Sequence, residues 1–471
     1  MFPGVSGSPQ HPSPAGEEAG WRSLQAKATL KTLGQHVEAG DLAAARAEYT
    51  TLAELTRHHN DPELRETRAK GAAALLGGIG NTGDIVAAES LYNEIANLAH
   101  DHPGEPPLRR WRARTAFLLL TTCGTAGELI AARQVYGVLA ALAQEHPGEA
   151  VLREELAKGA VHLTAVLSKA KLDDEARAFY DTLAALAASR PEEAILRELQ
   201  AKGAVNLIAG FAEVADADSA RALYATVAGL AAAYPGEAGL RAVQARAIVS
   251  LILALGNTRQ THAARTMHRA LIGLAAAHPD EAPLRVEQAR GAVNLVGMFG
   301  REGDIGAARE ALATIAAAAA AHPGDAELRE QLAKGTVNMV GALADGGDCD
   351  GAGAVYVTLP ALAAAHPDEP ALRRIQAMGM VNMIAGLAGR GRLGEAESLH
   401  RALAAMAAES PEDEALRAER LKGTANLIRV YAETGKVAEA LGLYQELQAL
   451  SLAYPDDLFL KHLMAPPAKP A

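Results

Sequence analysis

The sequence contains few of the residues that form covalent cross-links or aromatic binding surfaces. Two cysteines among 471 residues are too few for a disulfide framework or a cysteine-based zinc site, and a reducing compartment fits this usage. Aromatic residues make up 4% of the chain, while hydrophobic residues make up 49%. This balance argues against a β-rich enzyme and favours closely packed amphipathic helices with small contact residues.

Excess positive charge and long apolar runs are also absent. The 45 basic residues stand against 56 acidic ones, and the formal net charge of -11 opposes general attraction to a phosphate backbone. No stretch of about 18 uninterrupted apolar residues occurs, and the first residues show no basic region followed by an apolar run. We therefore expect a soluble, cytoplasmic protein that binds neither nucleic acid nor membrane.

One unit is repeated along almost the whole chain. Prolines recur every 44 residues, at Pro103, Pro147, Pro191, Pro235, Pro279, Pro323, Pro367, Pro411 and Pro455. On this period, residues 18–454 divide into ten copies, with small shifts in the first two. A period of this size indicates a solenoid or an array of repeats.

Each copy has the pattern of two helices. In residues 191–234 the first helix can start at Pro191, and a second helix carries Ala220 and Tyr224 after a break. That break holds glycine in seven copies, and alanine recurs at the place of Ala220 in all ten. A lone copy could not bury its apolar face, so neighbours must stack. The sequence therefore predicts an all-α fold, a right-handed α-solenoid of about ten helix-turn-helix repeats.

The ends differ from the repeats. Residues 1–17 are rich in Pro, Gly and Ser and are expected to form a disordered tail. Residues 455–464 restart the unit, and we expect a short capping helix there. Residues 465–471 are expected to form a second disordered tail.

A resemblance to a known family rests on residues 206–224, NLIAGFAEVADADSARALY. This string resembles the tetratricopeptide repeat in its Asn-Leu pair, the aromatic residue at the end of the first helix, the turn, and the alanine followed by tyrosine. The copies are 44 residues long rather than about 34, which is similar to the long-helix repeats of kinesin light chain. The resemblance implies that the first helices line a concave surface. Similarity to the repeats of the O-linked N-acetylglucosamine transferase implies an asparagine ladder that binds the backbone of an extended peptide.

A basic residue and, four positions later, an asparagine recur on one face of the first helix. At 100° per residue these two positions lie within about 40° of each other. A carboxamide offers both a donor and an acceptor to a peptide unit, and the lysines suggest positive potential for an acidic or C-terminal peptide segment. The candidate peptide-binding residues are Lys158, His162, Lys202, Asn206, Arg246, Arg290, Asn294, Lys334, Asn338, Asn382, Lys422 and Asn426. The alternative is structural: the asparagines can bond to a neighbouring helix, and the lysines can cover apolar surface.

A second basic series has a structural interpretation. All ten copies carry an arginine, from Arg22 to Arg417, with an acidic residue four positions earlier. Such a pair stabilises a helix by about 0.2–0.5 kcal/mol. We therefore interpret these arginines as partners of the acid one turn before them.

Catalytic and metal signals are weak. Histidines precede the repeat proline at His102, His146, His278, His322 and His366. Equivalent positions in successive copies lie at least about 8–10 Å apart, whereas zinc–nitrogen bonds are about 2 Å long. Cys123 should be a buried apolar residue, Cys349 should lie in a turn, and no nucleophile-elbow, Walker or metalloprotease string occurs.

The sequence thus favours a non-enzymatic scaffold without cofactor or metal, which binds a protein or peptide ligand. One alternative is a regulatory subunit of an enzyme on another chain, and another is an RNA-binding repeat protein similar to the pentatricopeptide family. Self-association through the solenoid ends is a further alternative, so the oligomeric state stays open.

Overall fold

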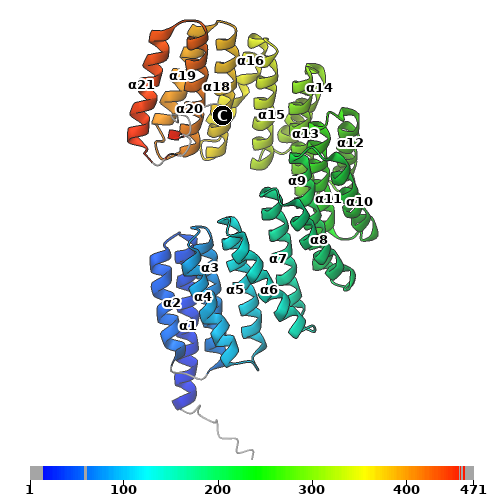
Figure 1. Ribbon diagram of the computed structural model, residues 1–471, viewed down its shortest axis with the longest axis vertical. Helices are drawn as coiled ribbons and strands as arrows, with labels where there is room; N and C mark the ends of the chain where they lie inside the picture. The colour runs from blue at the N-terminus through cyan, green and yellow to red at the C-terminus, as the bar shows by residue number, and fades with distance from the viewer. Residues whose placement is uncertain (1–13, 58–60, 456, 458–459, 462–471) are drawn as a thin grey trace, which may run out of the picture. The chain divides into compact units, whose positions relative to one another are not determined.

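The structure is a computed structural model that describes residues 14–57, 61–455, 457 and 460–461, and all regular structure in these residues is helical. The chain forms two compact units, Met1–Gly210 with Ala225–Val243 and Phe211–Tyr224 with Gln244–Ala471, and each is described by itself. Within each unit, helical hairpins stack side by side (Figure 1). The predicted all-α solenoid is confirmed.

First and second helices alternate along the chain. The first helices of the ten copies are α1 (Pro14–Glu38), α3 (Pro62–Gly80), α5 (Pro106–Thr125), α7 (Ala150–Lys169), α9 (Ala194–Glu213), α11 (Ala238–Asn257), α13 (Ala282–Glu302), α15 (Ala326–Asp345), α18 (Pro370–Gly389) and α20 (Glu414–Glu433). The second helices are α2 (Leu42–Arg57), α4 (Ile85–Asp101), α6 (Leu129–Glu145), α8 (Asp173–Ala188), α10 (Ala217–Ala233), α12 (Thr261–Ala277), α14 (Ile305–Ala321), α16 with α17 (Cys349–Tyr356 and Thr358–Ala365), α19 (Leu393–Ala408) and α21 (Val437–Ala453). The eighth second helix is interrupted at Val357, because Pro360 has no N–H to donate to the Tyr356 carbonyl.

The first helices form the more closely packed layer. In the first unit α1, α3, α5 and α7 contact one another in order, and in the second unit α13, α15, α18 and α20 do the same. Second helices pack on the first helix of their own copy and on that of the next copy, as α2 does on α1 and α3 in the first unit and α14 does on α13 and α15 in the second. Niches therefore remain between second helices of successive copies.

Small residues allow this close packing. Ala176, at the recurrent alanine position of α8, is fully buried. A Cβ atom on Gly203 of α9 would stand 3.2 Å from Leu183 Cδ2 and 3.3 Å from Tyr180 Cδ2, both on α8. In the second to tenth copies a leucine near the start of the first helix fills the same junction and is at most 1% exposed. The first copy has Trp21 at that place, 69% exposed, and no helix before α1 is among the described residues.

The turn inside each hairpin has one residue in the left-handed region. Seven copies place glycine there with φ from 74° to 86°, as the sequence predicts. The other three copies place Lys171, Ala215 and Arg259 there, with φ of 63°, 58° and 58°. The hairpin geometry therefore imposes this conformation even where the side chain opposes it.

The N-terminal boundary differs from the prediction. Helix α1 begins at Pro14, so residues 14–17 are helical, and their assignment to a disordered tail is wrong. The rest of that predicted tail, residues 1–13, and the predicted tail 465–471 lie outside the described residues.

Part of the predicted capping segment is described. The N–H groups of Leu460 and Lys461 donate to Asp457 Oδ1 and to the Asp457 carbonyl, both at 3.1 Å. Leu460 is buried against Leu421 of α20 and Leu447 of α21. Asp457 thus caps this segment as aspartates cap other first helices. Residues 456, 458–459 and 462–464 of the predicted capping helix lie outside the described part.

Candidate peptide-binding face

The recurrent arginine joins successive copies. Arg109 Nη2 donates to Glu149 Oε1 at 2.7 Å, and Arg109 Nη1 donates to the Pro103 carbonyl at 2.6 Å. Glu149 is the N-cap residue of α7, the next first helix. The same bridge forms in Arg65–Glu105, Arg153–Glu193, Arg197–Glu237, Arg329–Glu369 and Arg417–Asp457.

These bridges correct the predicted partner. Arg22 pairs with Glu18 at 3.5 Å, as expected for residues four apart in one helix. In the six bridged copies the partner is instead the acid 40 residues later, because the first helices lie side by side and bring the next N-cap acid to the guanidinium. The structural interpretation holds, but its assignment to pairs within one helix is wrong for these copies.

The ladder asparagines also span the junction between first helices. Their Nδ2 atoms donate to a main-chain carbonyl 45 residues earlier, on the preceding first helix. In the first unit Asn206 donates to Val161 at 3.1 Å. In the second unit the pairs are Asn294–Val249 at 3.4 Å, Asn338–Val293 at 3.1 Å and Asn382–Val337 at 3.3 Å. The structural alternative, in which the asparagines bond to a neighbouring helix, is therefore correct for the amide nitrogens of these four asparagines.

The carboxamide oxygens of these four asparagines have a different environment. No described group donates to them, and none of them is a buried atom, so each Oδ1 is open to solvent. Each Nδ2 atom carries two N–H groups and uses one of them to hold two copies together. The carboxamide therefore keeps its open acceptor and a second N–H, and its role toward a ligand stays a prediction.

A hollow follows this ladder in the second unit. It lies between α13, α15 and α18, has a volume of about 240 Å³ and is lined by Asn338 and Asn382. Glycine and alanine form its floor, and the exposed side chains of Arg301 and Asp345 stand at its edge. A Cβ atom on Gly341 would lie 3.1 Å from Asn382 Nδ2, so a small residue here makes room for the asparagine of the next copy.

The candidate lysines and arginines all have acidic partners. The pairs are Lys158–Glu154 (2.7 Å) and Lys202–Glu198 (2.7 Å) in the first unit, and Arg246–Glu287 (3.8 Å), Arg290–Glu287 (2.6 Å), Lys334–Glu330 (2.6 Å) and Lys422–Glu419 (2.6 Å) in the second. An ion pair contributes little net charge to the surface around it. The positive potential expected for an acidic peptide is therefore not formed by these residues.

His162 and Asn426 differ from the other ladder members. His162 is half-buried, and a Cβ atom on Gly124 would lie 2.6 Å from its Nε2 atom. Burial lowers the pKa of this imidazole, so it is neutral at pH 7. Asn426 is half-buried, and it has no hydrogen-bond partner among the residues that the structure describes.

Sequence reasoning missed several residues of this face. Asn257 Nδ2 donates to the Ala212 carbonyl at 2.9 Å and makes a further bond between first helices. The hollow also depends on Gly297 and Gly341, each three residues after a ladder asparagine. That recurrence of a small residue was the available signal.

The remaining candidates have structural environments. Within the described residues no three His, Cys, Asp or Glu side chains come together to hold a metal ion. Cys123 is buried as predicted, and burial raises the pKa of its thiol. Cys349 is the buried first residue of α16, so its assignment to a turn is wrong. Helix α11 is long and apolar enough to cross a membrane, yet half of that apolar stretch is buried in the protein as the first helix of the sixth copy.

Comparisons with known proteins identify one short family match. The family model described as PPR repeat matches residues 426–452, the end of α20 and most of α21, which is part of one copy of ten. No curated protein matches the chain.

Several solved structures are similar over most of the chain. A crystal structure of an engineered protein from the Northeast Structural Genomics Consortium gives a TM-score of 0.38 at 15% identity, over 86% of this chain and 95% of that chain. The structure of Naa15/Naa10 bound to HypK-THB gives 0.27 at 14% identity, over 91% and 73%. The APC/C hetero-tetramer Cut9-Hcn1 gives 0.20 at 12% identity, over 92% and 94%.

Proposed function

We propose that this chain is a non-enzymatic scaffold of the long-helix tetratricopeptide type, which binds an extended peptide segment of a partner protein on its first-helix face. The observation that carries the proposal is the row of open Oδ1 atoms beside a floor of glycine and alanine. An extended peptide presents N–H groups that need acceptors, and a floor without large side chains lets its backbone come close.

The spacing of the ladder suits such a ligand. Successive first helices pack about 8–10 Å apart, and an extended chain rises about 3.3 Å per residue. One asparagine acceptor therefore meets about every third residue of the peptide. Because backbone N–H groups are shared by all peptides except at proline, this contact fixes the conformation rather than the sequence of the ligand.

Charge plays a smaller part than the sequence suggests. The candidate basic residues are paired with glutamates, and the edge of the hollow carries one charge of each sign, Arg301 and Asp345. We therefore infer no preference for an acidic peptide. Binding should change little with salt, since few free charges are neutralised.

A second candidate function is favoured by the PPR match at residues 426–452, which raises single-stranded RNA as a ligand. Against it stand the net charge of -11 and the glutamates that pair with the basic residues of the first-helix face. RNA binding would weaken steeply with salt, because phosphate contacts release counterions. This difference separates the two candidates experimentally.

The test fills the hollow without touching the junction bonds. Ala385 lines the hollow, so Ala385→Trp should block it, whereas replacing the asparagines would also weaken the packing of first helices. The matched control is Ala405→Trp, on an exposed position of the second helix α19. Peptides selected from a phage library of random segments of about 12 residues would be measured by fluorescence anisotropy.

We expect Ala385→Trp to weaken peptide binding about tenfold or more, and Ala405→Trp to leave it unchanged. A gel shift with a single-stranded RNA of about 30 nucleotides at two salt concentrations tests the other candidate. Equal peptide affinity of both variants would refute the proposed face. Salt-sensitive RNA binding without any selected peptide would favour the PPR-type function instead.

A further inference from the structure

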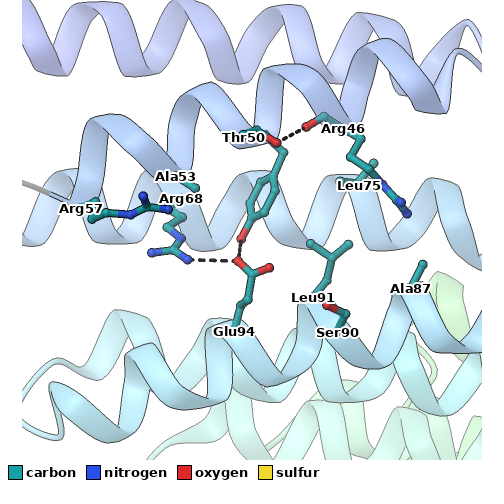
Figure 2. Close-up of a pocket in the computed structure, with 11 residues that line it drawn as sticks. Arg46, Thr50, Ala53, Arg57, Arg68, Leu75, Ala87, Ser90, Leu91 and Glu94 are labelled. Carbon is teal, nitrogen blue, oxygen red and sulfur yellow. Dashed lines mark hydrogen bonds and ion pairs between the residues drawn. The ribbon is translucent and has the colours of Figure 1, made fainter.

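A second cavity lies in the first unit, in the niche between the second helices α2 and α4, with α3 behind it (Figure 2). It has a volume of about 410 Å³, within the range of small-molecule sites. We call it the α2–α4 pocket. Its charged lining consists of Arg46, Arg57, Arg68 and Glu94, and Leu91 contributes to its apolar part.

The charges in this pocket do not balance. Arg68 Nη2 donates to Glu94 Oε2 at 3.0 Å, and the Tyr49 hydroxyl donates to the same oxygen at 3.0 Å. Neither Arg46 nor Arg57 has an ion-pair partner in the described part of the chain. Three guanidinium groups against one carboxylate leave two positive charges in the lining.

The donors are also incompletely used. The Nε atom of Arg68 is buried and has no hydrogen-bond partner in the structure. Figure 2 shows Arg57 and Arg68 at one end of the pocket and Arg46 at the other. Because Arg68 is already paired with Glu94, the two unpaired charges, Arg57 and Arg46, lie at opposite ends of the pocket.

Equivalent positions in later copies show that this combination of arginines is particular to the first junction, although arginine recurs at the place of Arg46 in five later copies. Arg133 occupies the place of Arg46 in the third copy and pairs with Glu175, whereas Ala87 stands at the corresponding place here. The place of Arg57 is taken by alanine from the fourth copy to the ninth. The repeat architecture supplies the niche, but it does not require these arginines.

We propose that the α2–α4 pocket binds a phosphate monoester dianion carried on a small apolar group. Such a phosphate carries about -1.5 to -2 charges at pH 7, which matches the two uncompensated positive charges of the lining. Its oxygens can accept several N–H groups from a planar guanidinium group such as that of Arg57. Leu91 offers a surface for the apolar part, and a monocarboxylate would neutralise only half of the charge.

Isothermal titration of the full chain with phenyl phosphate tests this site, with phenylacetate as the monoanionic comparison. We expect one phenyl phosphate per chain, bound about tenfold or more tightly than phenylacetate. Arg57→Gln should weaken phenyl phosphate about tenfold or more, and Arg46→Gln, at the other end of the pocket, should weaken it by a smaller factor. Arg133→Gln, at the place of Arg46 in the third copy, is the matched control and should leave the affinity unchanged.

Circular dichroism and thermal melting check that the variants fold. Because the side chains of Arg46 and Arg57 are both exposed, their replacement should not unfold the chain. Three results would overturn the proposal: no one-to-one binding of phenyl phosphate up to about 10 mM, equal affinity for phenylacetate, or wild-type affinity in both pocket variants. None of these results bears on the peptide-binding face, which lies on other helices.

Discussion

The last described bridge between copies gives a sharp test of how this solenoid is held together. Arg417 Nε donates to Asp457 Oδ2 at 2.9 Å, and Arg417 Nη1 donates to the Pro411 carbonyl at 2.8 Å. Its guanidinium carbon lies 4.1 Å from the centre of the Tyr454 ring. We predict that Arg417→Ala will release the end of the chain locally.

The magnitude follows from burial. The side chains of Arg417 and Asp457 are each 10% exposed. Removing one partner of a buried pair costs about 3–5 kcal/mol, and a ring contact adds about 1 kcal/mol or less. Local release lets Asp457 regain water, so we expect a loss of about 2–4 kcal/mol in local stability.

The control occupies the same place in the preceding copy. Arg373 pairs with Glu409, and these side chains are 36% and 68% exposed. Exposed pairs contribute about 0–1 kcal/mol, so Arg373→Ala should have a small effect. The comparison separates loss of a buried bridge from loss of an arginine in general.

Hydrogen exchange followed by mass spectrometry is the suitable assay, because repeat proteins open locally and a global melt averages over copies. In Arg417→Ala, protection in α20 and α21 should fall about 30-fold to 1000-fold, as each 1.4 kcal/mol is a factor of about ten. In Arg373→Ala the fall should be less than about fivefold. Equal effects in the two variants would show that the bridges do not hold the copies together.

Two further predictions concern the turns and the pH response. Residues 215 and 303 both have φ near 60–75°, so Ala215→Gly should stabilise its hairpin by about 0.5–1 kcal/mol and Gly303→Ala should destabilise its hairpin by a similar amount. The two variants should shift the denaturation midpoint in opposite directions, and shifts of the same sign would contradict this reasoning. Burial lowers the pKa of His268 and His400 below the ordinary 6.5, so the unfolded chain binds more protons and stability falls as the pH drops below about 6.5. Replacing both by tyrosine, the residue of most other copies, should reduce the difference in melting temperature between about pH 7.5 and about pH 5, and an unchanged difference would exclude these histidines as its source.

Much of the fold could be predicted from the sequence because the period is itself a physical constraint. A unit of 44 residues with two amphipathic stretches and a glycine between them has few ways to bury its apolar faces other than by stacking. The alanine that recurs at the place of Ala220 indicated where helices pack closely, and the structure buries Ala220 fully.

The partners of the polar ladders could not be predicted in the same way. In a periodic chain, an acid four residues before an arginine and an acid 40 residues after it are the same position of the repeat, so spacing alone cannot choose between them. The same holds for an asparagine that can face a ligand or the carbonyl 45 residues earlier. The side-by-side packing of first helices selects the actual partner, because it determines which groups lie within hydrogen-bonding distance of each other.

The α2–α4 pocket could not be predicted from the repeat period. Arg57 breaks the repeat pattern, because alanine stands at its place in most later copies, and a search for periodicity passes over a residue that does not recur. The sequence by itself determined the hairpins, their number and the places of close packing, because local periodicity and apolar burial act along the chain. The tertiary structure alone decided which charges and amides are satisfied and which remain open, because that depends on distances between residues of different copies.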